Sequence, residues 1–182
     1  MIPTPGPFGW VDAAARPRLF LVLSVLLGVL SIALAALGAP LVTAAAPWGI
    51  VSYEFAGTAE GAGRVLASWS PAAREHAMLT LGLDFLYLLV YPAWLSLACV
   101  FLAGNGFQPG PGIALAWAVL AAGALDAVEN LALIRLLTAG PGDAAAGLAW
   151  ACAGVKFALV LSAAAYVLAG AVGFGWRRLR SA

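Results

Sequence analysis

Four long runs of apolar residues dominate the sequence. They cover residues 19–39, 77–103, 113–137 and 148–172, and none alternates apolar and polar positions as the strands of a membrane β-barrel do. The hydrocarbon core of a bilayer is about 30 Å thick, so a helix needs roughly 20 apolar residues to cross it. The pattern therefore predicts an all-α fold. We expect a four-transmembrane-helix bundle that forms a single integral membrane domain over residues 1–182.

The first run has a second interpretation. Ala36, Leu37 and Gly38 resemble the small-residue cleavage site of a signal peptide. However, the run is longer than the roughly 7–15 apolar residues of a signal h-region. We therefore expect an uncleaved helix.

The segment between the first two runs, residues 40–76, is rich in aromatic residues. It is long for a structureless connection, and we expect it to be partly helical. Residues 58–69 can form a short amphipathic helix with Glu60 and Arg64 paired one turn apart. Ser70 and Pro71 are suited to the N-cap and first turn of the second long helix. The segment is either a cover at the membrane interface or a lid over a pocket.

The composition supports a membrane protein. Hydrophobic residues make up 64% of the 182 positions and charged residues 9%. Soluble domains average roughly 45–50% apolar and about 25% charged residues. So few charges cannot cover the surface of so small a domain in water, which excludes a soluble globular protein.

Positive charge is concentrated at the two ends of the chain. Five arginines flank the four runs there: Arg16, Arg18, Arg177, Arg178 and Arg180. Because loops rich in Lys and Arg stay in the cytoplasm, we expect both termini to be cytoplasmic and segment 40–76 to face outward. The high Ala and Gly content and the preference for Arg over Lys fit a high-GC genome, and in a bacterium the membrane would be the inner (cytoplasmic) membrane.

Five ionisable residues lie inside the runs: Asp84, Asp126, Glu129, Arg135 and Lys156. A charge at the bilayer centre costs roughly 2.5–3.5 kcal/mol, so such residues normally face the bundle interior and pair. At 1.5 Å per residue, Asp84, Glu129 and Lys156 all lie about 10–12 Å below one membrane boundary. We therefore expect one polar layer in the outer half of the membrane. Arg135 lies near the boundary and should reach the headgroups.

Seven residues are expected to form a ligand-binding site in this layer: Asp84, Tyr87, Tyr91, Asp126, Glu129, Asn130 and Lys156. The first three lie in the second run at positions i, i+3 and i+7. The next three lie in the third run at positions i, i+3 and i+4. Each set of three therefore shares one face of its helix. The carboxyls of Asp126, Glu129 and Asp84 are the candidate catalytic groups.

The charges in this layer do not balance. Three carboxylates would face a single ammonium, so we expect at least one carboxyl to be protonated at neutral pH. A buried pair can serve only to fix helix register, and Asn130 can bridge helices by hydrogen bonds. However, one lysine does not need three acids and an amide, and this excess favours a binding or catalytic pocket.

The layout of one run, a long aromatic segment and three closer runs resembles the EXPERA group of membrane proteins. That group includes sterol isomerases and the sigma-2 receptor. Its members use acidic residues inside a four-helix bundle to hold an amine or a carbocation-like centre. The resemblance implies this part for Asp84-Phe85-Leu86-Tyr87 and for Asp126-Ala127-Val128-Glu129-Asn130. The chain also looks like other four-span membrane proteins of bacteria.

Three classes of function stay open. The first is a protein that binds a lipid or an amphipathic small molecule in the pocket. The second is an intramembrane acid–base enzyme, an isomerase or cyclase acting on an isoprenoid-like lipid. The third is a proton-coupled carrier, or a polar cluster with a structural role alone.

Other partners have little support in the sequence. One histidine, His76, and two distant cysteines cannot build a metal or haem site, so no metal and no cofactor are expected. There is no phosphate loop or basic recognition face, so no nucleic acid partner is expected. The small residues Ala163, Gly170 and Gly173 would allow close helix contact, and a homo-oligomer is compatible with this pattern.

Overall fold

A computed structural model describes residues 6–181 of the protein, with side chains for residues 6–174. Within these residues every regular element is a helix, and four helices are long and apolar enough to cross a membrane. They are α1 (Arg16–Gly38), α4 (Pro71–Gly104), α5 (Pro109–Ala139) and α6 (Asp143–Ser181). The all-helical class and four long apolar helices are confirmed. The side chains of Arg177, Arg178 and Arg180 lie outside the described residues.

The helices are longer than the apolar runs that predicted them. α4 begins at Pro71, where the Ser70 hydroxyl accepts a hydrogen bond from the Ala73 N–H at 3.2 Å. This confirms the predicted N-cap, and it adds a polar first turn that a count of apolar residues omits. α5 likewise begins with Pro109 in its first turn, a position that tolerates proline.

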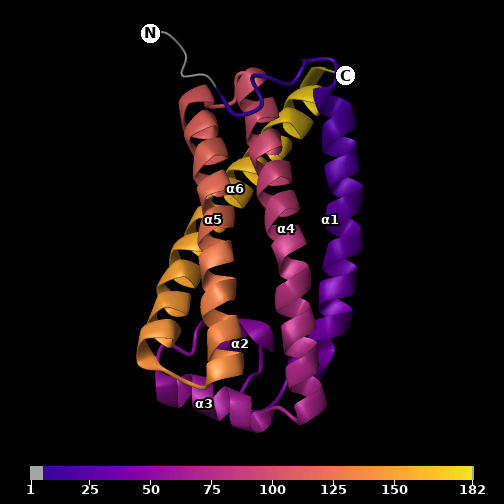
Figure 1. The fold of residues 1–182 in the computed structure, drawn as a ribbon. Helices are drawn as coiled ribbons and strands as arrows, with labels where there is room; N and C mark the ends of the chain where they lie inside the picture. Colours follow the sequence, from indigo (N-terminus) through magenta and orange to yellow (C-terminus); the bar gives the residue numbers. More distant parts are fainter. Residues whose placement is uncertain (1–5, 182) are drawn as a thin grey trace.

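α4 is the central helix, because it packs against α1, α5 and α6 (Figure 1). Leu23 and Leu30 of α1 pack with Val90 and Leu97 of α4. The Trp94 indole N–H of α4 also donates to the Ser24 hydroxyl of α1 at 2.8 Å. α6 crosses behind α5 at a clear tilt and packs against both α5 and α4.

The backbone of α5 approaches α4 closely beside Pro92 of α4. Pro92 has no N–H to donate, so the Leu88 carbonyl one turn earlier is free of its helical partner. Gly123 of α5 is packed into this place: a Cβ atom built on it would lie 2.8 Å from the Leu88 oxygen and 2.9 Å from Pro92 Cγ. The absence of a side chain at Gly123 is therefore what allows the two backbones to meet.

Residues 39–70 form a structured cap segment at the end of the bundle opposite residues 6–15 (Figure 1). The segment contains a short 3-10 helix, Ala39–Leu41, and the helices α2 (Ile50–Glu54) and α3 (Ala59–Ser68). The Thr58 side chain caps α3, and Arg64 pairs with Glu60 as the sequence predicts. The apolar side of this short amphipathic segment is buried; its residues are Ala62, Val65, Leu66 and Trp69.

Hydrogen bonds attach the cap segment to the long helices. The Trp69 indole N–H donates to the Leu41 carbonyl at 2.8 Å, and the Ala59 N–H donates to an Asp143 carboxylate oxygen of α6 at 2.7 Å. Tyr53 is 1% exposed and its hydroxyl donates to the Leu133 carbonyl of α5 at 3.4 Å. The segment is therefore packed structure and not a loose linker.

Two of the three small residues considered for oligomer contacts are used within the chain. Ala163 is fully buried, and Gly170 lies against Leu102 and Phe107. Gly173 alone of the three has open space beside it, with no atom within 4 Å of a built Cβ.

We predict that Gly123→Ala destabilises the bundle, because the added methyl group would collide with the Leu88 carbonyl and Pro92. Overpacking of this kind costs about 1–3 kcal/mol. Thermal unfolding in detergent should show a lower Tm. The matched control is Gly82→Ala in α4, where a Cβ meets nothing within 4 Å. Equal Tm values for the two variants would contradict the close approach.

Candidate functional site

The polar layer is organised around the Lys156 ammonium on α6. Lys156 Nζ donates to Asp126 Oδ1 of α5 at 2.9 Å and lies 2.9 Å from Glu129 Oε2. Both acids are on one face of α5, as their spacing predicts. All three side chains are buried, and Glu129 is fully shielded. Burial and short distance make each Coulomb attraction much stronger than it would be in water.

A second polar pair joins α5 to α4. The Asn130 side-chain amide donates to Asp84 Oδ2 at 2.7 Å. Asn130 follows Glu129 directly, so the two polar pairs adjoin on α5. Polar groups of α4, α5 and α6 therefore lie at one level of the bundle, as the counts along the helices predict.

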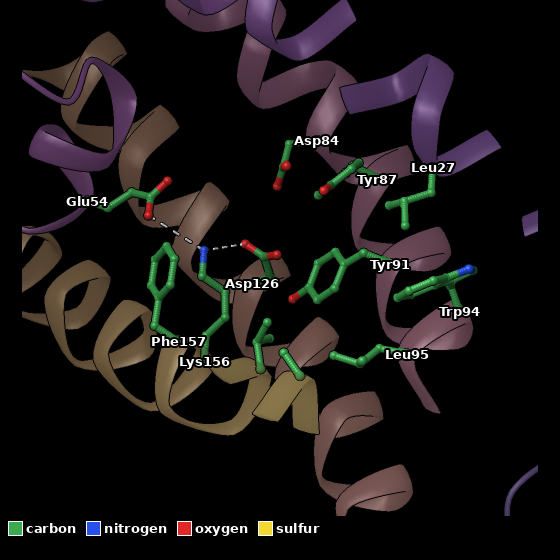
Figure 2. Close-up of a pocket in the computed structure, with 12 residues that line it drawn as sticks. Leu27, Glu54, Asp84, Tyr87, Tyr91, Trp94, Leu95, Asp126, Lys156 and Phe157 are labelled. Atoms are coloured by element: carbon green, nitrogen blue, oxygen red, sulfur yellow. Dashed lines mark hydrogen bonds and ion pairs between the residues drawn. The ribbon is translucent and has the colours of Figure 1, made fainter. Parts of the chain in front are cut away.

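Glu54, the last residue of α2 in the cap segment, also faces Lys156. Its Oε2 lies 3.7 Å from Lys156 Nζ, and the residue is buried. Figure 2 shows the Lys156 amino group between Glu54 and Asp126. The sequence interpretation missed this residue because it lies outside the four runs. A signal was present, since Glu54 is an acid between the aromatic residues Tyr53 and Phe55.

A cavity of about 390 Å³ opens beside these groups. Its wall combines polar and apolar side chains, with Leu27, Trp94 and Leu95 on one side and Glu54, Lys156 and Phe157 on the other (Figure 2). The polar residues of the wall are Glu54, Asp84, Tyr87, Tyr91, Asp126 and Lys156. The apolar residues are Leu27, Trp94, Leu95, Phe157, Val160 and Ala164.

The cavity wall combines residues from α1 with residues from α6. Leu27 of α1 and Phe157, Val160 and Ala164 of α6 are all half-buried. The cavity therefore reaches the surface on the side where α1 and α6 flank α4.

The two tyrosines of the predicted site differ in their contacts. The Tyr87 hydroxyl lies 3.4 Å from the Ser31 hydroxyl of α1. The Tyr91 hydroxyl is buried, interacts with the Asp126 carboxylate and points toward the side of the cavity that holds Asp126 and Lys156 (Figure 2). A buried hydroxyl of this kind is costly unless something bonds to it. Asp126 offers such a partner, and both side chains are part of the cavity wall.

The other residues predicted for the site lie outside the cavity wall. Glu129 and Asn130 are buried behind the cavity wall, where they hold Lys156 and Asp84 in place. Arg135 is exposed, as expected for a side chain that reaches the headgroups. Cys99 and Cys152 are both free and buried.

The charge on the buried Glu54 carboxyl depends on its surroundings in the fold. Burial raises the pKa of Glu54 above its ordinary value, while the Lys156 ammonium opposes this shift. A carboxyl whose pKa is raised on folding stabilises the fold below its ordinary pKa and loses that contribution as pH rises through the folded value.

Comparison of the chain with protein-family models, with curated proteins and with solved structures finds no match.

We predict that Glu54→Gln makes thermal stability less dependent on pH. In the wild type, Tm should fall as pH rises above the ordinary range of a glutamic acid, because ionised Glu54 is poorly solvated. The neutral amide of the variant does not ionise, so this fall in Tm should be absent. Glu60→Gln is the control, because Glu60 is exposed on α3. Parallel curves of Tm against pH for wild type and Glu54→Gln would refute the assignment.

We also predict that Lys156→Met costs about 3–5 kcal/mol, the usual effect of leaving buried charges without their partner. Adding Glu129→Gln should restore part of the loss, because one of the abandoned carboxylates is then neutral. Equilibrium unfolding of wild type, both single variants and the double variant measures the coupling. Additive effects would show that the two side chains do not interact.

Proposed function

We propose that the protein is an integral membrane protein that binds a lipid or an amphipathic small molecule in the cavity between α1, α4 and α6. The observation that carries this proposal is a cavity wall that combines acids and an ammonium with apolar side chains, Leu27, Trp94 and Leu95 lying together on the side away from Lys156 (Figure 2). The polar end of the ligand would meet Asp84, Tyr91 and Asp126. Its apolar part would lie along Leu27, Leu95 and Val160.

The apolar side chains of the wall are spread over a length that suits a chain. Lys156 and Ala164 are eight residues apart on α6, which corresponds to about 12 Å along a helix. Leu95 of α4 and Leu27 of α1 face the same space. An extended hydrocarbon would therefore have apolar contacts with three helices while its polar end stays at the acids.

The open side of the cavity supports entry from the membrane. α1 and α6 are both long and apolar enough to span a bilayer, so an opening flanked by them would face acyl chains. A ligand of this class is dissolved in the membrane already and would not need to cross water. In this proposal both termini are cytoplasmic, the membrane is the bacterial inner membrane, and the cap segment closes the outward end of the site.

The charge balance indicates what the polar end of the ligand supplies. Three carboxyls, from Glu54, Asp126 and Glu129, face one ammonium, and a fourth, Asp84, is part of the same cavity wall. The site therefore has more acceptors than donors, and hydrogen-bond donors on the ligand or a positive centre beside the acids would satisfy it. The resemblance to the EXPERA group is part of the same proposal, because acids inside a helical bundle have this role there.

An acid–base enzyme is the second candidate. The observation that favours it is the pair Asp126 and Glu129, both in contact with one ammonium and close to Asp84. Carboxyls in such a group can hold different protonation states, so that one donates a proton while another stabilises positive charge. An isomerase or cyclase acting on an isoprenoid-like lipid requires both roles.

We predict that wild-type protein purified from its own membranes retains a lipid or amphipathic molecule in native mass spectrometry. Asp84→Asn should weaken retention about tenfold, because hydrogen bonds to a charged group are worth roughly 1.5–3 kcal/mol. Glu60→Gln, far from the cavity on the exposed face of α3, should retain the ligand as wild type does.

The outcomes separate the candidate functions. Conversion of the retained molecule, abolished by Asp126→Asn, would establish the enzyme. Retention without conversion supports a binding protein. An empty cavity in wild type, together with a lower Tm in Asp84→Asn, would overturn the proposal in favour of a structural cluster.

A further inference from the structure

Lys156 is the only lysine in the sequence, and the eight other basic residues are arginines. Arginine is the usual choice for a buried partner of carboxylates, because its planar group bonds two oxygens at once. Among the side chains that the structure describes, the chain nevertheless has a lysine at the one position where a base meets three acids. A lysine supplies something that an arginine lacks, a primary amine that can become a nucleophile.

The amine is placed where it can react. Lys156 is part of the cavity wall, beside the apolar side chains of Phe157 and Val160. Its Nζ lies 5.1 Å from the centre of the Phe157 ring. A molecule held along the apolar wall would therefore have its polar end within reach of this nitrogen.

The surrounding acids supply the proton transfers that an amine needs. Asp126 and Glu129 each approach Nζ to 2.9 Å, and Glu54 to 3.7 Å. One carboxylate can take a proton from the ammonium and so expose the nitrogen lone pair. The others remain as counterions. A single ion pair would need only one of these three groups.

We propose that Lys156 binds a long-chain or polyene aldehyde covalently, as a Schiff base. This inference rests on the proposed binding function and names the ligand class. The amine nitrogen forms a bond to the aldehyde carbon while the carbonyl π bond breaks, and a proton passes from that nitrogen to the carbonyl oxygen, which becomes a hydroxyl. The carboxyl that took the proton returns it to that hydroxyl, which leaves as water while the nitrogen lone pair forms the C=N bond.

The step balances in atoms and charge. An ammonium and an aldehyde give a protonated imine and one water molecule, and every carboxylate ends as it began. The positive charge stays on the same nitrogen, so Asp126 and Glu129 still face a cation after the reaction. Burial of Lys156 limits access of water to the C=N bond and so slows hydrolysis.

The test uses the full-length wild-type protein in detergent, with dodecanal as the probe and sodium cyanoborohydride to reduce any imine. Peptide mapping by mass spectrometry then compares alkylation of Lys156 with alkylation of the N-terminal amine of the same molecule. We expect Lys156 to react at least about tenfold faster, because the cavity holds the aldehyde beside it. Dodecanol, which has the same chain but no carbonyl, should protect Lys156.

Lys156→Arg is the matched variant, because it keeps the positive charge and removes the primary amine. It should lose the alkylation inside the cavity and keep that of the N-terminus. If this variant does not fold, protection of the wild type by dodecanol tests the same point.

Each result decides between the two proposals. Retention of dodecanol in native mass spectrometry without alkylation of Lys156 would overturn the Schiff base and leave the binding function intact. Equal alkylation of both amines, unaffected by dodecanol, would also overturn the Schiff base. If neither dodecanol nor dodecanal is retained, the inference fails together with chain binding in this cavity.

Discussion

A single ammonium buried among apolar helices is the constraint on which the rest of the structure depends. Lys156 is buried, so its charge must be balanced by protein groups at contact distance. Asp126 and Glu129 provide this from α5, and Glu54 provides it from the cap segment. Because these acids belong to separate elements, satisfying one charge positions α5, α6 and the cap segment relative to one another.

Close packing of the helices gives the polar groups their distances. Hydrocarbon side chains provide no hydrophobic gain on helix association in a bilayer, so van der Waals contact and hydrogen bonds decide which faces meet. Gly123 allows α5 to approach α4 at Pro92. The bond between Asn130 and Asp84, two turns further along, lies at the same helix interface. Small residues and polar residues therefore act together at this interface.

Glu54 of the cap segment lies outside the four long helices but is part of the polar site between them. Movement of α2 would therefore change the charge balance at Lys156. The cavity beside this group has both acids and apolar side chains in its wall. The same arrangement that neutralises Lys156 also gives its amine proton acceptors and leaves it facing the space where a ligand would lie.

The sequence alone determined the features that depend on local or periodic patterns. Apolar runs identified the four long helices, Ser70 and Pro71 identified the start of α4, and counts along the runs placed Asp84, Glu129 and Lys156 in one layer. Each of these follows from the thickness of a bilayer or from helix geometry. Which acid meets which base was decided by the tertiary structure. The sequence interpretation omitted Glu54, because the folding of the cap segment brings it to Lys156 and no spacing within one helix encodes that contact. The cavity likewise exists only through the volumes of side chains from α1, α4, α5 and α6 that meet in the folded chain.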